Sequence, residues 1–304
     1  MRIPNNILNC VTFLGVRPND GPLAGKFVCL GTGFFIVMEQ AGVHFSYLVT
    51  AKHVLDEAQR GGFKNVEARL NKKEGSAEIV KLVDNDQWIR YENPAVDVAI
   101  TAYSIDFNVF DCAAMPLRMF ADAHSVSQHG IGPGDELFTV GLFSLKEGRQ
   151  RNIPIVRSGI IAAMPNESEP FIRTSGTYHA YLAEMRSIGG LSGSPVFVFI
   201  DHRNRIVPYT GLIMSGERND WTIFCIGLIR GHWDLDRETS DTIVAQDEKE
   251  DVRLGFSKGE NLNVGIAIVM PSQYILGILK HEKLETMRKE FVAMQDKENE
   301  PGQG

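Results

Sequence analysis

Short apolar segments rich in β-branched residues recur along most of the chain, and this recurrence limits the fold more than any other feature. In the first half they cover residues 27–37, 45–50, 66–70, 78–83, 88–91 and 97–103. In the second half they read ELFTVGLF, PIVRSGIIAAM, HAYLAEM, PVFVFI, TIFCIGLIRG and VGIAIVM. Turn-forming clusters such as MEQAGVH and NKKEG separate them. The runs at 27–37 and 45–50, with MEQAGVH between them, predict a hairpin. Regular short strands with turns between them predict an all-β barrel or sandwich rather than an alternating α/β sheet.

Two features divide this strand pattern. The block IGPGD at residues 131–135 contains Gly-Pro-Gly and marks the start of a second unit. Near the C-terminus, helical spacing predicts a single helix from the apolar residues Ile275, Leu276, Leu279, Leu284 and Met287. The polar tail QDKENEPGQG that follows is expected to be disordered.

Composition and charge argue against several classes of protein. Of the 304 residues 43% are apolar and 23% are charged, which is enough for a globular core. A net charge of −7 without a cluster of basic residues argues against a nucleic-acid partner. The N-terminus lacks the pattern of a secretory signal, and no run approaches the roughly 18 apolar residues of a membrane span. No membrane association is therefore expected.

The cysteines are widely scattered and form no CxxC pair, as the positions Cys10, Cys29, Cys112 and Cys225 show. This spacing predicts no metal site and a reducing, cytoplasmic setting. Cys29 and Cys225 lie within apolar runs, where we expect them to be buried small side chains.

One serine stands out in the stretch GGLSGSPVFVF at residues 189–199, where small residues surround Ser192 just before an apolar strand. The stretch is either a plain tight turn or a nucleophile with space cleared for a substrate carbonyl. A serine nucleophile needs an adjacent base, and that base needs an orienting acid. The stretch also nearly matches the Gly-x-Ser-x-Gly elbow of α/β-hydrolases, but the strand-rich pattern opposes that fold.

A base and an acid of the required kind occur in the first half. Among eight histidines, only His53 lies at the end of an apolar strand and the start of a short helical segment, in YLVTAKHVLDEA. Asp97 begins the apolar strand of NPAVDVAI, where an unpaired carboxylate would be costly to bury. A histidine facing this acid would remove that cost. The rival acids are Asp84, Asp86 and Asp111.

In this order, the segments YLVTAKHV, VDVAI and GGLSGSPVF resemble the chymotrypsin-like (trypsin-like) serine peptidases. The closer likeness is to bacterial branches of the HtrA type and the glutamyl-endopeptidase type. The resemblance spans roughly residues 31–279 and implies two packed six-stranded antiparallel Greek-key β-barrels with a C-terminal α-helix on the second. We expect one barrel over residues 1–125 with His53 and Asp97, a second over 126–271 with Ser192, and the helix and disordered tail over 272–304.

The resemblance also implies roles for these residues. His53 would be the general base, Asp97 its orienter and Ser192 the nucleophile. The backbone N–H groups of Gly190 and Ser192 would form the oxyanion hole, where a side chain at position 190 would obstruct the carbonyl. No cofactor or metal is needed, and the substrate would be a protein or peptide. Its backbone would pair with the strand CIGLIRG, whose substrate-binding residues would be Ile229, Arg230 and Gly231.

The sequence departs from the family at several positions. Digestive members carry an acid where this chain has Leu191, and a disulfide cysteine where it has Val54. The strand CIGLIRG lacks the hydroxyl residue that supports the catalytic acid in those enzymes, and no PDZ segment follows Met270. We therefore expect a site that is preformed or ordered by a ligand. A dormant fold that binds peptides, or an effector switched on by a protein partner, stays open as the alternative.

Primary specificity is predicted in two opposite directions. Arg186, six residues before the serine, would favour an acidic substrate side chain. The run WDLDRETSDTIVAQDEKED at residues 233–251 has eight acidic and two basic residues, and would favour a basic substrate or bind a cation. Alternatively, Arg186 is a surface residue and the acidic run a solvated insertion.

Overall fold

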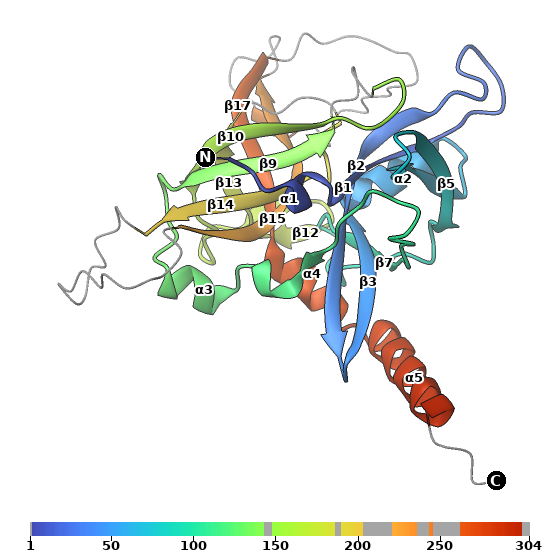
Figure 1. Ribbon diagram of the computed structural model, residues 1–304. Coiled ribbons are helices and arrows are strands. Elements are labelled where there is room, and N and C mark those ends of the chain that lie inside the picture. The colour runs from blue at the N-terminus through green and yellow to red at the C-terminus, as the bar shows by residue number, and fades with distance from the viewer. Residues whose placement is uncertain are drawn as a thin grey trace.

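The chain folds into two large β-sheets packed side by side, with helices at the C-terminus (Figure 1). This computed structural model describes residues 2–142, 148–185, 190–202, 221–235, 243–245 and 262–299. Arg186 and most of the acidic run at 233–251 lie outside these residues.

The first half forms one eight-stranded sheet. Its main path has the order β5-β4-β1-β2-β3-β7-β6, and β8 pairs with β2 in parallel. The strands are β1 (Val11–Val16), β2 (Val28–Gln40), β3 (Val43–Thr50), β4 (Asn65–Asn71), β5 (Ala77–Asp84), β6 (Ile89–Arg90), β7 (Ala99–Ala102) and β8 (Met115–Pro116). Within the described part of the chain, β5 and β6 do not pair with each other, so this sheet is an open half-barrel.

The second half closes on itself. Six strands follow one another in the order β14-β9-β10-β13-β17-β15, and β14 pairs with β15 to complete the ring. They are β9 (Glu136–Leu142), β10 (Pro154–Ala163), β13 (Tyr181–Glu184), β14 (Pro195–Asp201), β15 (Trp221–Leu235) and β17 (Leu262–Pro271). The short strand β16 (Ile243–Ala245) pairs with β15, and β11 (Phe171–Arg173) forms a hairpin with β12 (Gly176–Tyr178). The expected all-β, chymotrypsin-like two-barrel arrangement is confirmed. The second barrel has the expected six strands, whereas the first is an open half-barrel of eight strands rather than six.

The predicted hairpin of the first half joins β2 and β3 through a two-residue loop. Gln40 pairs with Val43, and the residues between them, Ala41 and Gly42, have φ of 52° and 76°. Positive φ at both loop positions gives the right-handed twist that lets the two strands continue as a long ribbon. At the other end of this ribbon, β3 leads into α2 (Lys52–Arg60).

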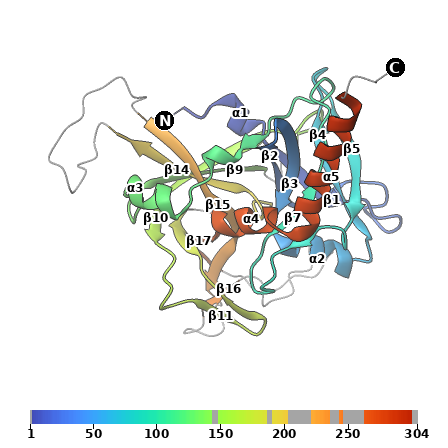
Figure 2. The ribbon, with the colours of Figure 1, turned by 90° about the horizontal axis from the view of Figure 1, so that it is seen from below.

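The C-terminus forms two helices where one was expected. The first, α4 (Ser272–Leu279), lies between the two sheets against β7, β15 and β17 (Figure 2). The second, α5 (Glu282–Asn299), lies beside the β2–β3 hairpin rather than on the second barrel. Buried Arg288 fixes it there, because its Nε donates to Gln40 Oε1 (2.7 Å) and its Nη1 to the Tyr47 hydroxyl (2.9 Å). The tail expected to be disordered begins at residue 295, yet α5 continues to Asn299.

The remaining helices are short. They are α1 (Asn5–Leu8), the 3₁₀ turn at Leu117–Met119 and α3 (Ala123–Gln128). The expected domain boundary at residue 125 falls inside α3. No helix among the described residues is long and apolar enough to cross a membrane.

One hydrophobic core is shared by the two sheets. Buried side chains of the first sheet, such as Phe34 and Leu48, belong to the same cluster as Phe138 and Phe197 of the second. A smaller cluster fills the inside of the closed barrel. Cys29 and Cys225 are both buried, as predicted. This shared core holds the two halves together.

Candidate active site

His53 and Asp97 are brought together by strand pairing. Thr50 at the end of β3 lies opposite Ala99 at the start of β7, so the chain just after β3 runs beside the chain just before β7. The His53 backbone N–H donates to Asp97 Oδ1 (2.8 Å), and His53 Nδ1 lies 2.6 Å from Asp97 Oδ2. An ionised carboxylate only accepts hydrogen bonds, so Nδ1 carries the proton and Nε2 is left as the basic nitrogen.

Asp97 keeps its charge although only 5% of its side chain is exposed. Burial alone raises the pKa of this carboxyl. Its interactions with His53 and with the Arg230 guanidinium, whose Nε lies 3.7 Å from Oδ2, outweigh burial and hold the pKa well below its usual range. The rival acids have other surroundings, since Asp84 and Asp86 are exposed and Asp111 pairs with Arg151.

Ser192 lies in the loop before β14, and this loop is bonded to both sheets. On one side, the Gly193 N–H donates to the Ile229 carbonyl in β15 (2.8 Å), and the Ser192 Oγ lies 3.4 Å from the Arg230 carbonyl. On the other side, the Thr32 N–H of β2 donates to the Ser192 carbonyl (2.8 Å). Strands from each half therefore fix the position of Ser192.

The residues around Ser192 are small because the loop packs closely against β2 and β3. Gly193 has a φ of 84°, and a Cβ atom there would lie 2.2 Å from the Thr32 carbonyl oxygen and 2.6 Å from Thr50 Oγ1. Gly190 has a φ of 94°. Glycine adopts such angles without strain, and it alone lets the loop lie this close to β2 and β3.

Thr32 contacts the loop that carries Ser192, and no pattern in the sequence pointed to it. Its hydroxyl donates to the Gly190 carbonyl (2.7 Å) and accepts from the Leu142 N–H (3.3 Å). Among the residues that the structure describes, neither the Gly190 N–H nor the Ser192 N–H donates a hydrogen bond. The Gly190 carbonyl is held by Thr32.

The positions that depart from the family are apolar contacts here. Leu191 is buried, and a Cβ atom on Gly141 would lie 2.4 Å from its Cδ2, so it fills the space beside β9. Val54 is buried against Gly31 of β2 in the same way. Leu191 cannot form the charge pair of the digestive enzymes and Val54 cannot form their disulfide, and the four cysteines form no disulfide with one another.

The three residues expected to bind substrate have different surroundings. Ile229 is fully buried, and its N–H and carbonyl bond to Ser194 and Gly193 of the loop. Arg230 is buried and contacts Asp97 rather than lining an open surface. Gly231 is half-buried and faces Ile268 of β17. Of the three, Gly231 is the most exposed.

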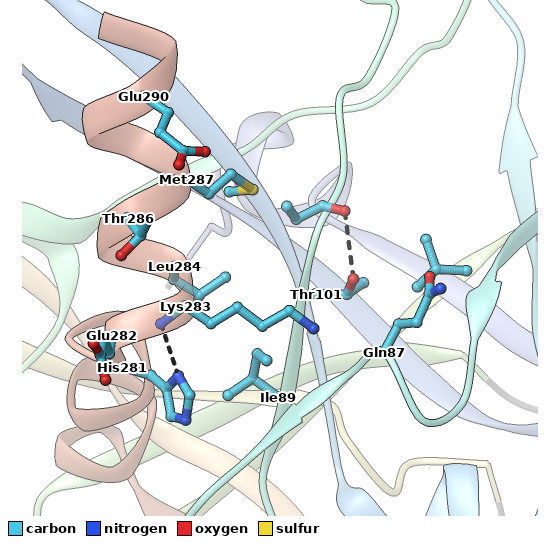
Figure 3. A pocket seen from close by; sticks show the side chains of 12 residues that line it. Gln87, Ile89, Thr101, His281, Glu282, Lys283, Leu284, Thr286, Met287 and Glu290 are labelled. Atoms are coloured by element: carbon cyan, nitrogen blue, oxygen red, sulfur yellow. Dashed lines mark hydrogen bonds between the residues drawn. The ribbon is translucent and has the colours of Figure 1, made fainter. Parts of the chain in front are cut away.

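A cavity of about 770 Å³ lies away from these residues, between α5 and the neighbouring strands (Figure 3). Leu284 and Met287 of α5 line it, together with Ile89 of β6 and Thr101 of β7. None of the site residues named above lines it. Among the described residues, no group of three histidine, cysteine or acidic side chains is placed to hold a metal ion.

Comparison with solved structures finds protease domains. The MamO protease domain from Magnetospirillum magneticum is 12% identical with a TM-score of 0.49, covering 90% of this chain and 98% of that one. The Rv3671c protease in its inactive form is 16% identical with a TM-score of 0.44, covering 90% and 92%. Deg5 is 13% identical with a TM-score of 0.41, covering 80% and 87%. No family model and no curated protein matches the sequence.

Proposed function

We propose that the chain is a serine endopeptidase that cleaves peptide bonds through an acyl-enzyme. The observation that carries this proposal is the double hydrogen bond between His53 and the buried, ionised Asp97, at 2.8 Å and 2.6 Å. It fixes both the ring orientation and the tautomer that a general base for serine requires. The bonding of the Ser192 loop to both sheets supports the same assignment.

In the proposed reaction, Ser192 Oγ attacks the scissile carbonyl carbon while His53 Nε2 takes the hydroxyl proton. Asp97 stabilises the imidazolium that forms and keeps its own charge. The negative oxygen accepts hydrogen bonds from the N–H groups of Gly190 and Ser192. His53 then gives its proton to the leaving amine, and an ester on Ser192 is left. Water attacks this ester by the same proton path in reverse and releases the second product.

The Ser192 hydroxyl has to turn for the first step. In the structure its oxygen lies 3.4 Å from the Arg230 carbonyl, which is longer than the usual O–H···O distance of about 2.7–2.8 Å. Such a long bond offers little resistance to rotation about the Cα–Cβ bond. Substrate binding would bring the hydroxyl onto His53 Nε2.

A fluorophosphonate probe tests the proposal, because it phosphonylates only an activated serine. We expect the native chain to be labelled, and Ser192→Ala and His53→Ala to lose labelling. The matched control is Ser194→Ala, since Ser194 lies in the same loop but its buried hydroxyl has no hydrogen-bond partner in the described structure. This variant should be labelled at the native rate. A folded native chain without labelling would instead favour the dormant peptide-binding fold or the partner-activated effector.

Specificity is tested on the same chain with two peptide series, one with Glu and one with Lys or Arg before the scissile bond. Faster cleavage of the Glu series that Arg186→Ala abolishes would assign Arg186 to the primary pocket. Faster cleavage of the basic series, lost when the acids of residues 234–251 are replaced by amides, would assign the acidic run.

A further inference from the structure

Arg230 sits at an irregularity of β15 that directs its side chain into the protein. Ile229 pairs with Val269 of β17, and Gly231 pairs with the adjacent Ile268, so Arg230 is an extra residue in the ladder. Such a bulge turns a side chain away from the direction that strand alternation would give it. The Arg230 side chain is 4% exposed, and its Nε lies 3.7 Å from Asp97 Oδ2.

The β11–β12 hairpin also contacts the Arg230 guanidinium. Its Nη1 donates to the Tyr178 hydroxyl, and its Cζ lies 4.5 Å from the centroid of the Tyr178 ring. Tyr178 in turn stacks on Phe171. The hairpin also reaches the chain before Asp97, because the Asn93 side-chain amide donates to the Thr177 carbonyl. Arg230 is thus enclosed between this hairpin and the proposed catalytic acid.

One residue therefore contacts two members of the proposed triad. The Arg230 side chain pairs with Asp97, and its carbonyl lies within reach of the Ser192 hydroxyl. Oxygen Oδ2 of Asp97 contacts two cations whenever His53 is protonated, since it lies 2.6 Å from Nδ1 and 3.7 Å from the arginine Nε. In a buried site, a second cation beside the carboxylate lowers the stability of the imidazolium.

We propose that Arg230 is a positioning residue that acts through Asp97. It fixes the carboxylate against His53, in place of the hydroxyl residue that the sequence lacks on this strand, and it offsets part of the carboxylate charge. His53 then releases its proton more readily and stays a base at lower pH than it would without Arg230. The role in catalysis rests on the proposed function, but the effect on His53 does not.

The charged and titratable groups around His53 come from several elements. Asp97 approaches from the chain before β7, Arg230 from β15 and Tyr178 from β12. Lys52 precedes His53 in α2, and its ammonium donates to the carbonyl of Pro94. Of these groups, Arg230 is the cation that contacts Asp97, so its removal tests the proposal directly.

The experiment titrates His53 by NMR in the full chain carrying Ser192→Ala, with His53→Ala used to assign the ring signal. With Arg230→Met we expect the imidazole pKa to rise by on the order of one unit. With Arg230→Lys, which keeps the positive charge, it should stay near the value with Arg230. In the chain with Ser192 intact, the acid limb of the labelling-rate profile should move to higher pH in Arg230→Met by the same amount.

The control is Arg288→Met, because Arg288 is as buried as Arg230 and also donates to a tyrosine hydroxyl, but its bonds go to neutral groups. It should leave the imidazole pKa unchanged. If Arg230→Met does not fold, Arg230→Gln serves instead, since it is neutral and can still donate to Tyr178. An imidazole pKa that stays constant or falls in the neutral variants overturns the proposal. A rise in the pKa without labelling of the native chain would uphold it, and would favour the dormant peptide-binding fold or the partner-activated effector over a peptidase that is active on its own.

Discussion

Asp97 holds the imidazole of His53 through Oδ2 at Nδ1, and its Oδ1 accepts a hydrogen bond from the His53 backbone N–H. In Asp97→Asn, the amide NH₂ group cannot accept the proton of Nδ1, so the ring turns or takes the other tautomer. We expect the fluorophosphonate labelling rate to fall on the order of 10⁴-fold. Second-order rate constants at pH 7 measure this effect. A fall of less than about tenfold would mean that another acid orients His53.

The lowered pKa of Asp97 also sets the pH dependence of stability. The unfolded carboxyl has a pKa of about 3.9, and the folded value lies below it, so the ionised form stabilises the fold. This contribution is complete above about pH 4 and is lost as the pH falls toward the folded pKa. We expect the native chain to exceed Asp97→Asn in free energy of unfolding at pH 7, and the difference to shrink at pH 3. Urea denaturation at both pH values measures it, and an equal difference at both would contradict the prediction.

Gly193 provides a test of loop packing at a single position. In Gly193→Ala, the new Cβ atom would meet the Thr32 carbonyl oxygen at 2.2 Å, in addition to the strain of a φ of 84°. The matched control is Gly62→Ala, where φ is 82° but no atom lies within 4 Å. We expect the control to cost about 1–2 kcal/mol of stability without affecting labelling. Gly193→Ala should cost more and also abolish labelling. Equal losses of stability would show that backbone strain alone matters.

At the scale of elements, β2 holds the Ser192 loop of the other half through Thr32. In Thr32→Val, the Gly190 carbonyl and the Leu142 N–H both lose their partner. We expect a loss of about 1–3 kcal/mol of stability and a labelling rate at least tenfold lower, because the Gly190 peptide is no longer held.

The control for Thr32 is Thr12→Val. Thr12 is equally buried, and its hydroxyl donates to the Arg69 carbonyl at 2.7 Å within the first sheet. A similar loss of stability is expected there, with labelling unchanged. If both variants lose labelling alike, the effect of Thr32 is on folding and not on the site.

Elements with a local signal were predictable from the sequence. The β2–β3 hairpin was expected from two apolar runs around a polar turn, and the structure has it. Strand β1 was not predicted; all its residues are buried, so the segment shows no polar alternation. The single C-terminal helix proved to be two, because helical spacing continues past the break at Lys280.

The sequence singled out the candidate site residues that stand in a motif, and it missed those that do not. His53, Asp97 and Ser192 each stand in a recognisable segment, and the structure brings His53 against Asp97 and Ser192 against the β15 chain. Thr32 acts through a contact with residue 190, which lies far along the chain, so no local pattern marks it. Arg230 was expected to bind substrate, since strand alternation does not reveal the bulge that turns it inward.

At the scale of the whole molecule, Asn152 links the two halves. Its side chain bonds to the Arg69 carbonyl and guanidinium, and its N–H donates to the Asn71 side chain at 2.7 Å. In Asn152→Ala we expect the free energy of unfolding to fall by about 2–3 kcal/mol, with one cooperative transition. Calorimetry measures this loss. The control is Asn65→Ala, because, among the described residues, the Asn65 side-chain amide donates only to the carbonyl of the adjacent Val66 and so does not link the two halves. Two separate transitions in the native chain would contradict a shared core.

The buried cysteines Cys10 and Cys225 allow the rate at which the folded structure opens to be measured. Burial raises the pKa of the Cys225 thiol to about 12 and raises that of Cys10 as well, so neither is a reactive thiolate in the closed structure. A thiol reagent modifies them only when the structure opens and exposes them to solvent. The rate of modification therefore reports how often the structure opens. Cys10 lies beside β1 and Cys225 within β15, one in each half. Both belong to the core shared by the two sheets, so equal rates at the two would mean that this core opens in a single event.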